Sequence, residues 1–71
     1  MKIVTCVEIV CGVVDSMKAF GNMETAMRYF DSIVPDDGSW YEVYRGDDGA
    51  YAVDSPDDVY EIHISEVEVE G

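Results

Sequence analysis

The stretch METAMRYFDSIV, residues 23–34, decides the fold, because it carries the clearest periodicity in the chain. Its apolar residues recur at i, i+3, i+4, i+7, i+10 and i+11, the spacing that gathers side chains on one face of an α-helix. Asn22 is a good N-cap, and Glu24 places a negative charge in the first turn, where the helix dipole favours it. Pro35 ends the helix because the residue before a proline avoids the α region. The predicted core-facing stripe is Met23, Ala26, Met27, Phe30, Ile33 and Val34.

Upstream of this helix, residues 2–11, KIVTCVEIVC, alternate as a β-strand that is largely apolar on both faces. The odd-numbered residues share one face, and the even-numbered residues share the other. A strand of this kind needs a cover on its second face, around Val4, Cys6 and Val10, either from a helix of the same chain or from a second subunit. Gly12 breaks the run, and residues 13–20 form a second strand after a tight hairpin turn.

Downstream of the helix, two short aromatic strands are expected at residues 40–45, WYEVYR, and 50–53, AYAV, joined by a GDDG turn. A long last strand runs from residue 59 to about residue 69. Its apolar residues change face, so we expect a bulge or bend near Ser65 and Glu66. The chain therefore predicts a single α+β domain, residues 1–71, in two layers. One helix packs on a four- to five-stranded, mainly antiparallel sheet in the order ββαβββ.

The chain is strongly acidic, with 16 Asp and Glu against four Lys and Arg, and its formal net charge is −12. This balance opposes direct binding to nucleic acid, whose phosphates need Lys and Arg. No apolar run approaches the length of a membrane span, and the first residues lead straight into an alternating segment rather than a signal peptide. We expect a basic partner, no direct nucleic-acid contact, no membrane and a cytoplasmic location, which is the host cytoplasm if a phage encodes the chain.

Few residues offer catalytic or metal chemistry. Cys6 and Cys11 are expected to be buried free thiols, because residues five apart on a strand point to opposite faces and only one histidine accompanies them. His63 shares a strand face with Glu61 and Ser65, but a flat strand supplies neither an oxyanion site nor a substrate pocket. The sequence contains no glycine-rich nucleotide-binding loop and no nucleophile elbow. We expect no catalysis, no cofactor and no metal site.

The negative charge is concentrated in the second half, since residues 36–71 contain twelve acids and Arg45 as their one base. Glu66, Glu68 and Glu70 would form a row of like charges about 6.8 Å apart on one side of the last strand. Such a row repels itself, so it indicates a surface that meets a basic partner. The alternative is that the acids protect edge strands and keep a small domain soluble.

The aromatic residues of the second half are candidates for anchors within this acidic region. Trp and Tyr are enriched at binding hot spots, although strands favour them as well. Alternation places Trp40, Glu42 and Tyr44 on one face, so we expect at least one exposed aromatic side chain. The predicted partner-binding residues are Asp36, Asp37, Glu42, Asp47, Asp48, Asp54, Asp57, Asp58, Glu61, Glu66, Glu68, Glu70, Trp40 and Tyr44.

The chain resembles, in general character, the small acidic inhibitor proteins of phages and mobile elements, including anti-CRISPR proteins and other nucleic-acid mimics. The shared features are small size, acidic balance, the hairpin-then-helix run GVVDSMKAFGNMETAMRYF at residues 12–30 and an acidic second half punctuated by Asp-Asp-Gly. The resemblance assigns no residue a role. It implies a non-enzymatic protein that engages a nucleic-acid-binding protein or nuclease complex and inhibits it. Two alternatives stay open: a structural or adaptor module acting as a homodimer, and a cation-binding acidic module.

Overall fold

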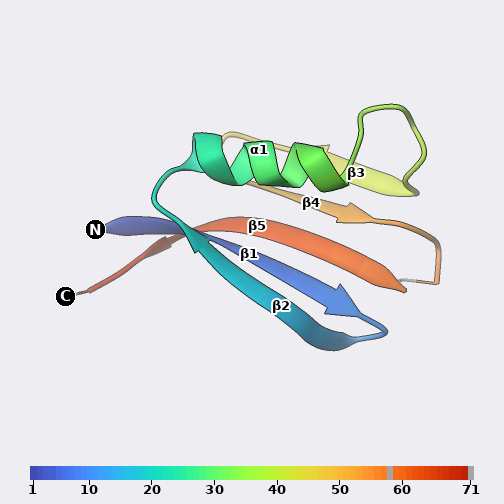
Figure 1. Cartoon of the computed structure of the whole chain (residues 1–71), viewed down its shortest axis with the longest axis horizontal. Helices are drawn as coiled ribbons and strands as arrows, with labels where there is room; N and C mark the ends of the chain where they lie inside the picture. The colour runs from blue at the N-terminus through green and yellow to red at the C-terminus, as the bar shows by residue number, and fades with distance from the viewer. Residues whose placement is uncertain (58, 71) are drawn as a thin grey trace.

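The computed structural model describes residues 1–57 and 59–70, and its elements follow the predicted order (Figure 1). All neighbouring strands are antiparallel, in the spatial order β2-β1-β5-β4-β3. The predicted α+β fold, one helix on a five-stranded sheet in the order ββαβββ, is confirmed. The elements are β1 (Lys2–Val10), β2 (Val13–Phe20), α1 (Met23–Ile33), β3 (Glu42–Arg45), β4 (Gly49–Val53) and β5 (Tyr60–Glu68).

The helix α1 forms where the apolar periodicity predicts it. The side chain of Asn22 accepts a hydrogen bond of 2.8 Å from the backbone N–H of Thr25, which confirms Asn22 as the N-cap. At the other end the N–H of Val34 donates to the carbonyl of Phe30 at 2.8 Å. Val34 itself is extended, because it precedes Pro35, so the helix ends one residue earlier than the stripe suggested.

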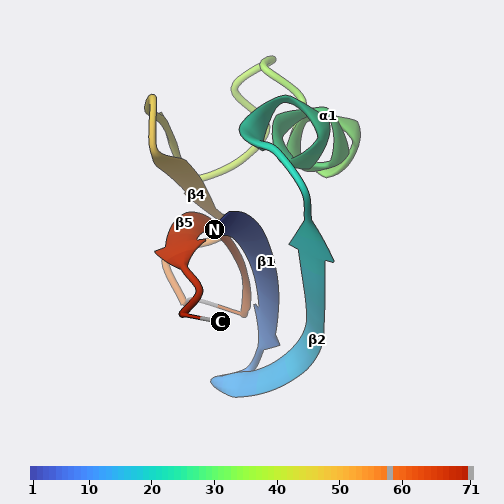
Figure 2. The same ribbon diagram turned by 90° about the vertical axis from the view of Figure 1, so that its left-hand side faces the viewer.

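The core lies between α1 and one face of the twisted sheet (Figure 2). Phe30 of the helix and Ile62 of β5 are fully buried there, as are Val4 and Cys6 of β1 to within 2%. The face of β1 that the homodimer alternative assigned to a second subunit is therefore the face that α1 covers, and that assignment is wrong. The buried cluster is Val4, Cys6, Ala26, Phe30, Val34, Ala50, Ala52, Ile62 and Ile64.

The two cysteines lie in different environments. Cys6 is buried in the core as a free thiol, as predicted. Cys11 is exposed, so the prediction of a second buried thiol is wrong. The reason is that Cys11 and Gly12 form the two-residue turn between β1 and β2, with φ of +52° and +80°. Positive φ at both central residues is typical of a type I′ hairpin turn, which takes Cys11 out of the strand.

The last strand is regular, and the bulge predicted near Ser65 is wrong. β5 pairs with β1 over its whole length without a register shift. The irregularity lies in the β1–β2 hairpin instead, where Asp15 is the extra residue of β2 opposite the Glu8–Ile9 step. Val67 lies on the face of the sheet opposite Ile62 and Ile64. No bulge is needed for this, because that opposite face also carries apolar side chains.

Both chain ends lie at the same end of the sheet (Figure 1). The N–H of Val69 donates to the carbonyl of Met1 at 2.7 Å, which extends the pairing of β5 with β1. In the described part of the chain no helix combines the length and the apolar character that crossing a bilayer requires.

Candidate binding surface

The sheet face turned away from α1 has no covering helix or second sheet in the described residues, and we call it the open face (Figure 2). Alternate residues of each strand project onto it, and the strand pairing fixes which side chains are neighbours. Its residues are Val14, Met17 and Ala19 of β2; Ile3, Thr5, Val7 and Ile9 of β1; Glu61, His63, Ser65 and Val67 of β5; Gly49, Tyr51 and Val53 of β4; and Glu42 and Tyr44 of β3.

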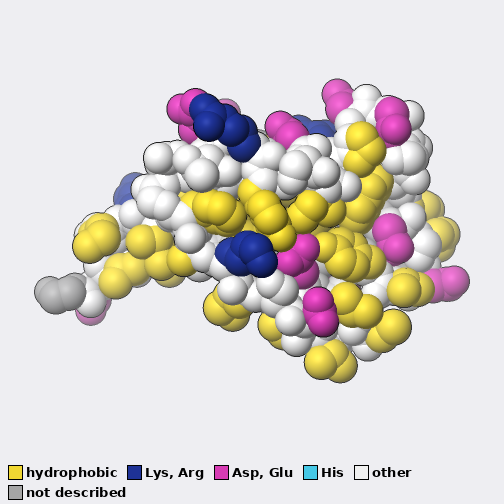
Figure 3. All heavy atoms as spheres, viewed as in Figure 1, with side chains coloured by type: hydrophobic (Ala, Val, Ile, Leu, Met, Phe, Trp, Pro, Cys, Tyr) yellow, Lys and Arg dark blue, Asp and Glu magenta, His cyan; other side chains and the backbone are white. Residues whose placement is uncertain are grey.

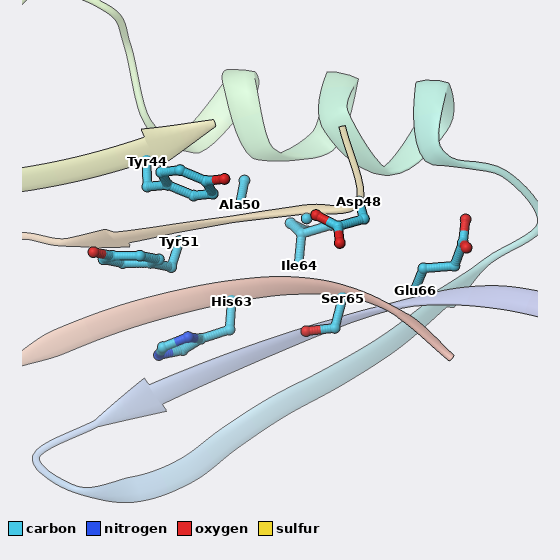
Figure 4. Close-up of a pocket in the computed structure, with 9 residues that line it drawn as sticks. Tyr44, Asp48, Ala50, Tyr51, His63, Ile64, Ser65 and Glu66 are labelled. Atoms are coloured by element: carbon cyan, nitrogen blue, oxygen red, sulfur yellow. The ribbon is translucent and has the colours of Figure 1, made fainter. Parts of the chain in front are cut away.

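A row of large side chains crosses the open face from one edge of the sheet to the other. Tyr44, Tyr51, His63, Val7 and Met17 are paired in successive strands. The ring centroids of Tyr44 and Tyr51 are 5.7 Å apart and those of Tyr51 and His63 6.0 Å apart, with 22° between the planes in each pair (Figure 4). We call these three rings the aromatic row. Stacked pairs of this kind contribute about 0.5–1.5 kcal/mol beyond their buried area.

A neighbouring row of the open face carries its two carboxylates. Glu42 and Glu61 flank Val53 in the pairing of β3, β4 and β5. Tyr51 Oη donates to Glu42 Oε1 at 2.9 Å, and His63 Nε2 lies 3.3 Å from Glu61 Oε1. The hydrogen bond to Glu42 raises the pKa of Tyr51 above its ordinary value. These contacts hold each carboxylate beside a ring of the aromatic row.

On the other side of the aromatic row the side chains are small, and the surface is hollowed. Gly49 and Ser65 are paired there, and a Cβ on Gly49 would lie 2.5 Å from the carbonyl oxygen of Ile64, so the position requires glycine. The hollow has a volume of about 550 Å³ (Figure 4). Its lining is Tyr44, Tyr51, His63, Gly49, Ser65, Ala50, Ile64, Asp48 and Glu66.

The positive side chains all belong to the helix side of the molecule. Lys2, Lys18 and Arg45 alternate with open-face residues on their strands, and Arg28 is on α1. The open face, in residues 1–57 and 59–70, therefore has carboxylates but no Lys or Arg. The cations contact helix-side groups: Lys2 with Glu66 (3.3 Å), Arg28 with Glu24 (2.8 Å), Arg45 with Asp31 (3.2 Å), and Lys18 with the ring of Tyr29 (5.4 Å from the centroid).

The acids that the sequence places in loops form two groups, one at each end of the sheet (Figure 1). Asp37 and Asp54 have structural roles, because they accept hydrogen bonds from the N–H groups of Ser39 at 2.9 Å and Tyr60 at 3.0 Å. The connections α1–β3 and β4–β5 lie at one end and carry Asp36, Asp37, Asp54 and Asp57. The β3–β4 turn and the C-terminal part of β5 lie at the other end and carry Asp47, Asp48, Glu66, Glu68 and Glu70.

The predicted row of like charges at the C-terminus is partly neutralised. Glu66 Oε1 lies 3.3 Å from Lys2 Nζ, and Glu68 Oε1 lies 3.3 Å from the N-terminal amine. Both pairs are largely exposed, so each contributes little to stability. The strand pairing of β1 with β5 thus brings the positive N-terminus of the chain beside its most acidic segment.

The remaining predicted binding residues are divided between the open face and the core. Glu42, Glu61 and Tyr44 lie on the open face, and half of the Tyr44 surface is exposed. Trp40 packs against the core, with its ring centroid 5.6 Å from that of Tyr60. The prediction that Trp40 shares a face with Tyr44 is wrong, because β3 begins only at Glu42 and strand alternation does not extend to Trp40. Asp58 lies outside the described residues.

The single histidine shares a face with Glu61 and Ser65, as predicted. His63 contacts Glu61, whereas no hydrogen bond in the described residues joins His63 to Ser65. In the same part of the chain no group of three or more His, Cys, Asp and Glu side chains is placed to share a metal ion.

A half-buried carboxylate on the helix side, Glu8, had no assigned role in the sequence. Tyr60 Oη donates to it at 2.5 Å and Tyr29 Oη at 3.3 Å. The hydrogen bond from Tyr60 lowers the pKa of Glu8, and burial raises the pKa of Tyr60. The signal in the sequence that could have found it is that Glu8 is the one acid among the mainly apolar even-numbered residues of the first strand. This cluster joins β1, β5 and α1, so it is a structural clamp beside the core.

Comparison of the chain with protein-family models, with curated proteins and with solved structures found no match. The open face combines a hollow, stacked rings and uncovered sheet surface in one place.

Proposed function

We propose that this chain is a non-enzymatic binding protein whose open face engages a basic nucleic-acid-binding protein or nuclease complex and blocks its substrate. The observation that supports this most strongly is the composition of the open face. In the described residues it carries carboxylates, stacked rings and aliphatic side chains but no Lys or Arg. Such a surface favours a partner that brings both positive charge and apolar contact area.

Large apolar side chains on the open face supply the contact area. Met17 is 68% exposed, Val14 57% and Val67 41%. Figure 3 shows hydrophobic side chains at the surface over the β1–β2 hairpin. Scattered exposed residues of this kind are common on any protein, but here the strand pairing places them on one continuous face with Tyr44. A partner seated on this face would bury them together.

The overall charge favours a basic partner over a second copy of the chain. Two copies would bring two net charges of −12 together, and their open faces would place carboxylates opposite carboxylates. A surface that binds nucleic acid carries clustered Lys and Arg instead. The Asp pairs at the two ends of the sheet flank the open face, so they add long-range attraction that speeds association. Blocking follows because the bound acidic domain occupies the phosphate-binding surface.

Affinity capture with a matched pair of charge-reversal variants tests this proposal. The tagged chain is incubated with a lysate of its source cells at low and moderate salt, and bound proteins are identified by mass spectrometry. We expect one nucleic-acid-binding protein to be retained, and to be released by competing DNA or RNA and by salt. Glu42→Lys with Glu61→Lys should abolish retention. Asp47→Lys with Asp57→Lys makes the same change in net charge away from the open face and should leave most of it.

Two outcomes contradict the proposal. If the two double variants lose retention equally, net charge rather than the open face carries the binding. If the chain captures only itself, or a non-basic protein in a salt-independent way, the adaptor alternative replaces the inhibitor. Circular dichroism of both variants establishes that they are folded before either result is interpreted.

A further inference from the structure

We infer that the hollow beside the aromatic row is a binding site for an arginine side chain of the partner. This inference rests on the proposed function and names the chemical group that the open face recognises. The hollow's volume, about 550 Å³, falls within the range of about 300–1,000 Å³ that is usual for ligand sites. Three of its features, the rings, the carboxylate of Asp48 and the small floor, match a guanidinium group.

The first feature is an aromatic wall. Tyr44, Tyr51 and His63 come from three adjacent strands, and their rings line one side of the hollow (Figure 4). The rings are held by one another and by the turn, since Tyr44 lies so close over Gly46 that a Cβ there would be 2.5 Å from its hydroxyl. A guanidinium packs on aromatic side chains both as a cation and as a flat group.

The second feature is a carboxylate away from the rings. Asp48, in the β3–β4 turn, lines the hollow (Figure 4). Asp48 forms no ion pair with any cation in the described residues, whereas the side chain of Glu66 lies on the helix side and pairs with Lys2 at 3.3 Å. A carboxylate binds a guanidinium through two parallel hydrogen bonds, the strongest arrangement available to it. The same charge opposes an anionic ligand.

The third feature is the floor, where Gly49 and Ser65 leave depth between the rings and Asp48. A long side chain can therefore reach the Asp48 carboxylate while its stem lies along the rings. Lysine could also reach, but its compact ammonium is strongly hydrated and cannot stack as a plane. A metal ion fits less well, because in the described residues no three His, Cys, Asp or Glu side chains converge. Arginine is the cation that uses both walls.

A nuclear magnetic resonance titration with short peptides tests the inference. Three blocked tripeptides, glycine-arginine-glycine, glycine-lysine-glycine and glycine-citrulline-glycine, are added to the isotope-labelled chain. We expect the arginine peptide to shift the amide signals of Gly49, Tyr51, His63 and Ser65. The lysine peptide should bind at least about fivefold more weakly, and the neutral citrulline peptide should give no shifts.

A matched pair of variants in one turn provides the control. Asp48→Asn removes a carboxylate that lines the hollow, and it should weaken arginine binding at least about threefold. Asp47→Asn makes the same charge change one residue earlier, outside the hollow, and should have almost no effect. Tyr44→Leu removes part of the aromatic wall on an exposed edge strand and should weaken binding similarly. The amide spectrum of each variant reports whether it is folded.

The inference is overturned if arginine and lysine peptides bind alike, if the shifts map elsewhere, or if the two Asn variants behave alike. These results leave the proposed function to the capture experiment, which depends on Glu42 and Glu61 rather than on Asp48. Conversely, arginine binding without a captured basic protein would keep the site and refute the proposed partner. The two failures are therefore distinguishable.

Discussion

The two faces of this sheet are built from the same five strands, yet one is sealed and the other is open. On β5, Ile62 and Ile64 are buried under α1, whereas His63 and Val67 alternate with them on the open face, which no element of the described residues covers. A domain of this size buries only about 60% of the surface that its unfolded chain exposes. Apolar side chains left outside the core therefore add little to its stability. Their presence on one continuous face is the feature that the proposed partner would bury.

The faces also differ in charge. All four Lys and Arg belong to the helix side, where three of them contact a carboxylate within 4 Å. On the open face, within the described part of the chain, Glu42 contacts Tyr51 and Glu61 contacts His63, and neither has a Lys or Arg partner. The cations of the chain are therefore paired on the helix side, whereas the two carboxylates of the open face have no Lys or Arg beside them in the described residues. Docking by the open face would bring these carboxylates to a basic surface.

The largest difference between the faces should appear in their stability effects. Phe30 is fully buried, and it packs under the guanidinium of Arg45 at 5.2 Å. Phe30→Ala should lower the free energy of unfolding by about 3–5 kcal/mol, enough to unfold much of the population. Met17→Ala on the open face should change it by no more than about 0.5 kcal/mol. Urea unfolding followed by circular dichroism measures both, and similar losses would mean that the open face is covered in solution.

The second-largest effect should be a loss of stability at alkaline pH, caused by groups buried on the covered face. Burial raises the pKa of the Cys6 thiol from 9.0 to about 11, and burial also raises the pKa of Tyr60. The folded state therefore holds these protons more tightly than the unfolded chain does. The resulting stability is fully present below pH 9 and is lost as the pH rises toward 11. We expect the free energy of unfolding to fall by on the order of 2 kcal/mol across that interval.

Urea unfolding at a series of pH values, with two cysteine variants, checks this expectation. Cys6→Ala removes the buried thiol, so it should flatten part of the alkaline loss even though the variant starts less stable. Cys11→Ser removes the exposed thiol and serves as the control. An alkaline slope that Cys6→Ala leaves unchanged would show that ionisation of the core thiol is not its cause.

The sequence predicted the elements because their signals are local. The helical stripe, the cap at Asn22 and the turn chemistry at GDDG each lie within a dozen residues, and the structure has all three. The strand boundaries and the exposed position of Cys11 depended on which residues occupy the hairpin turn. That choice was ambiguous because an apolar cysteine fits a strand as well as it fits the turn.

The site was harder to predict because it depends on pairing between distant strands. Both faces of β1 are apolar, so the sequence could not say whether α1 would cover Val4 or Val7. The aromatic row requires the register of β3, β4 and β5, which no local pattern supplies. The Glu8 clamp likewise joins residues up to 52 positions apart. The exposure of Tyr44 on a face with Glu42 followed from simple alternation. The packing of Trp40 against the core did not follow from it.

Two adjacent valines of β2 give the smallest and most direct test of the comparison. Val13 and Val14 are 69% and 57% exposed, but Val13 pairs with Val10 on the helix side and Val14 pairs with Ile9 on the open face. Each Val→Ser change should alter the free energy of unfolding by no more than about 0.5 kcal/mol, because little apolar surface is buried at either position. Partner retention should differ: Val14→Ser should weaken it and Val13→Ser should not.

The capture experiment measures this difference with folding held constant. Because the two substitutions are chemically identical and lie one residue apart, any selective loss must come from the face rather than from composition or strand propensity. Equal retention by both variants would remove β2 from the contact and confine it to the side of the open face around Tyr44, Tyr51 and His63. A selective effect of Val13→Ser would place the partner on the helix side, and the open face would then need another explanation for its exposed apolar row.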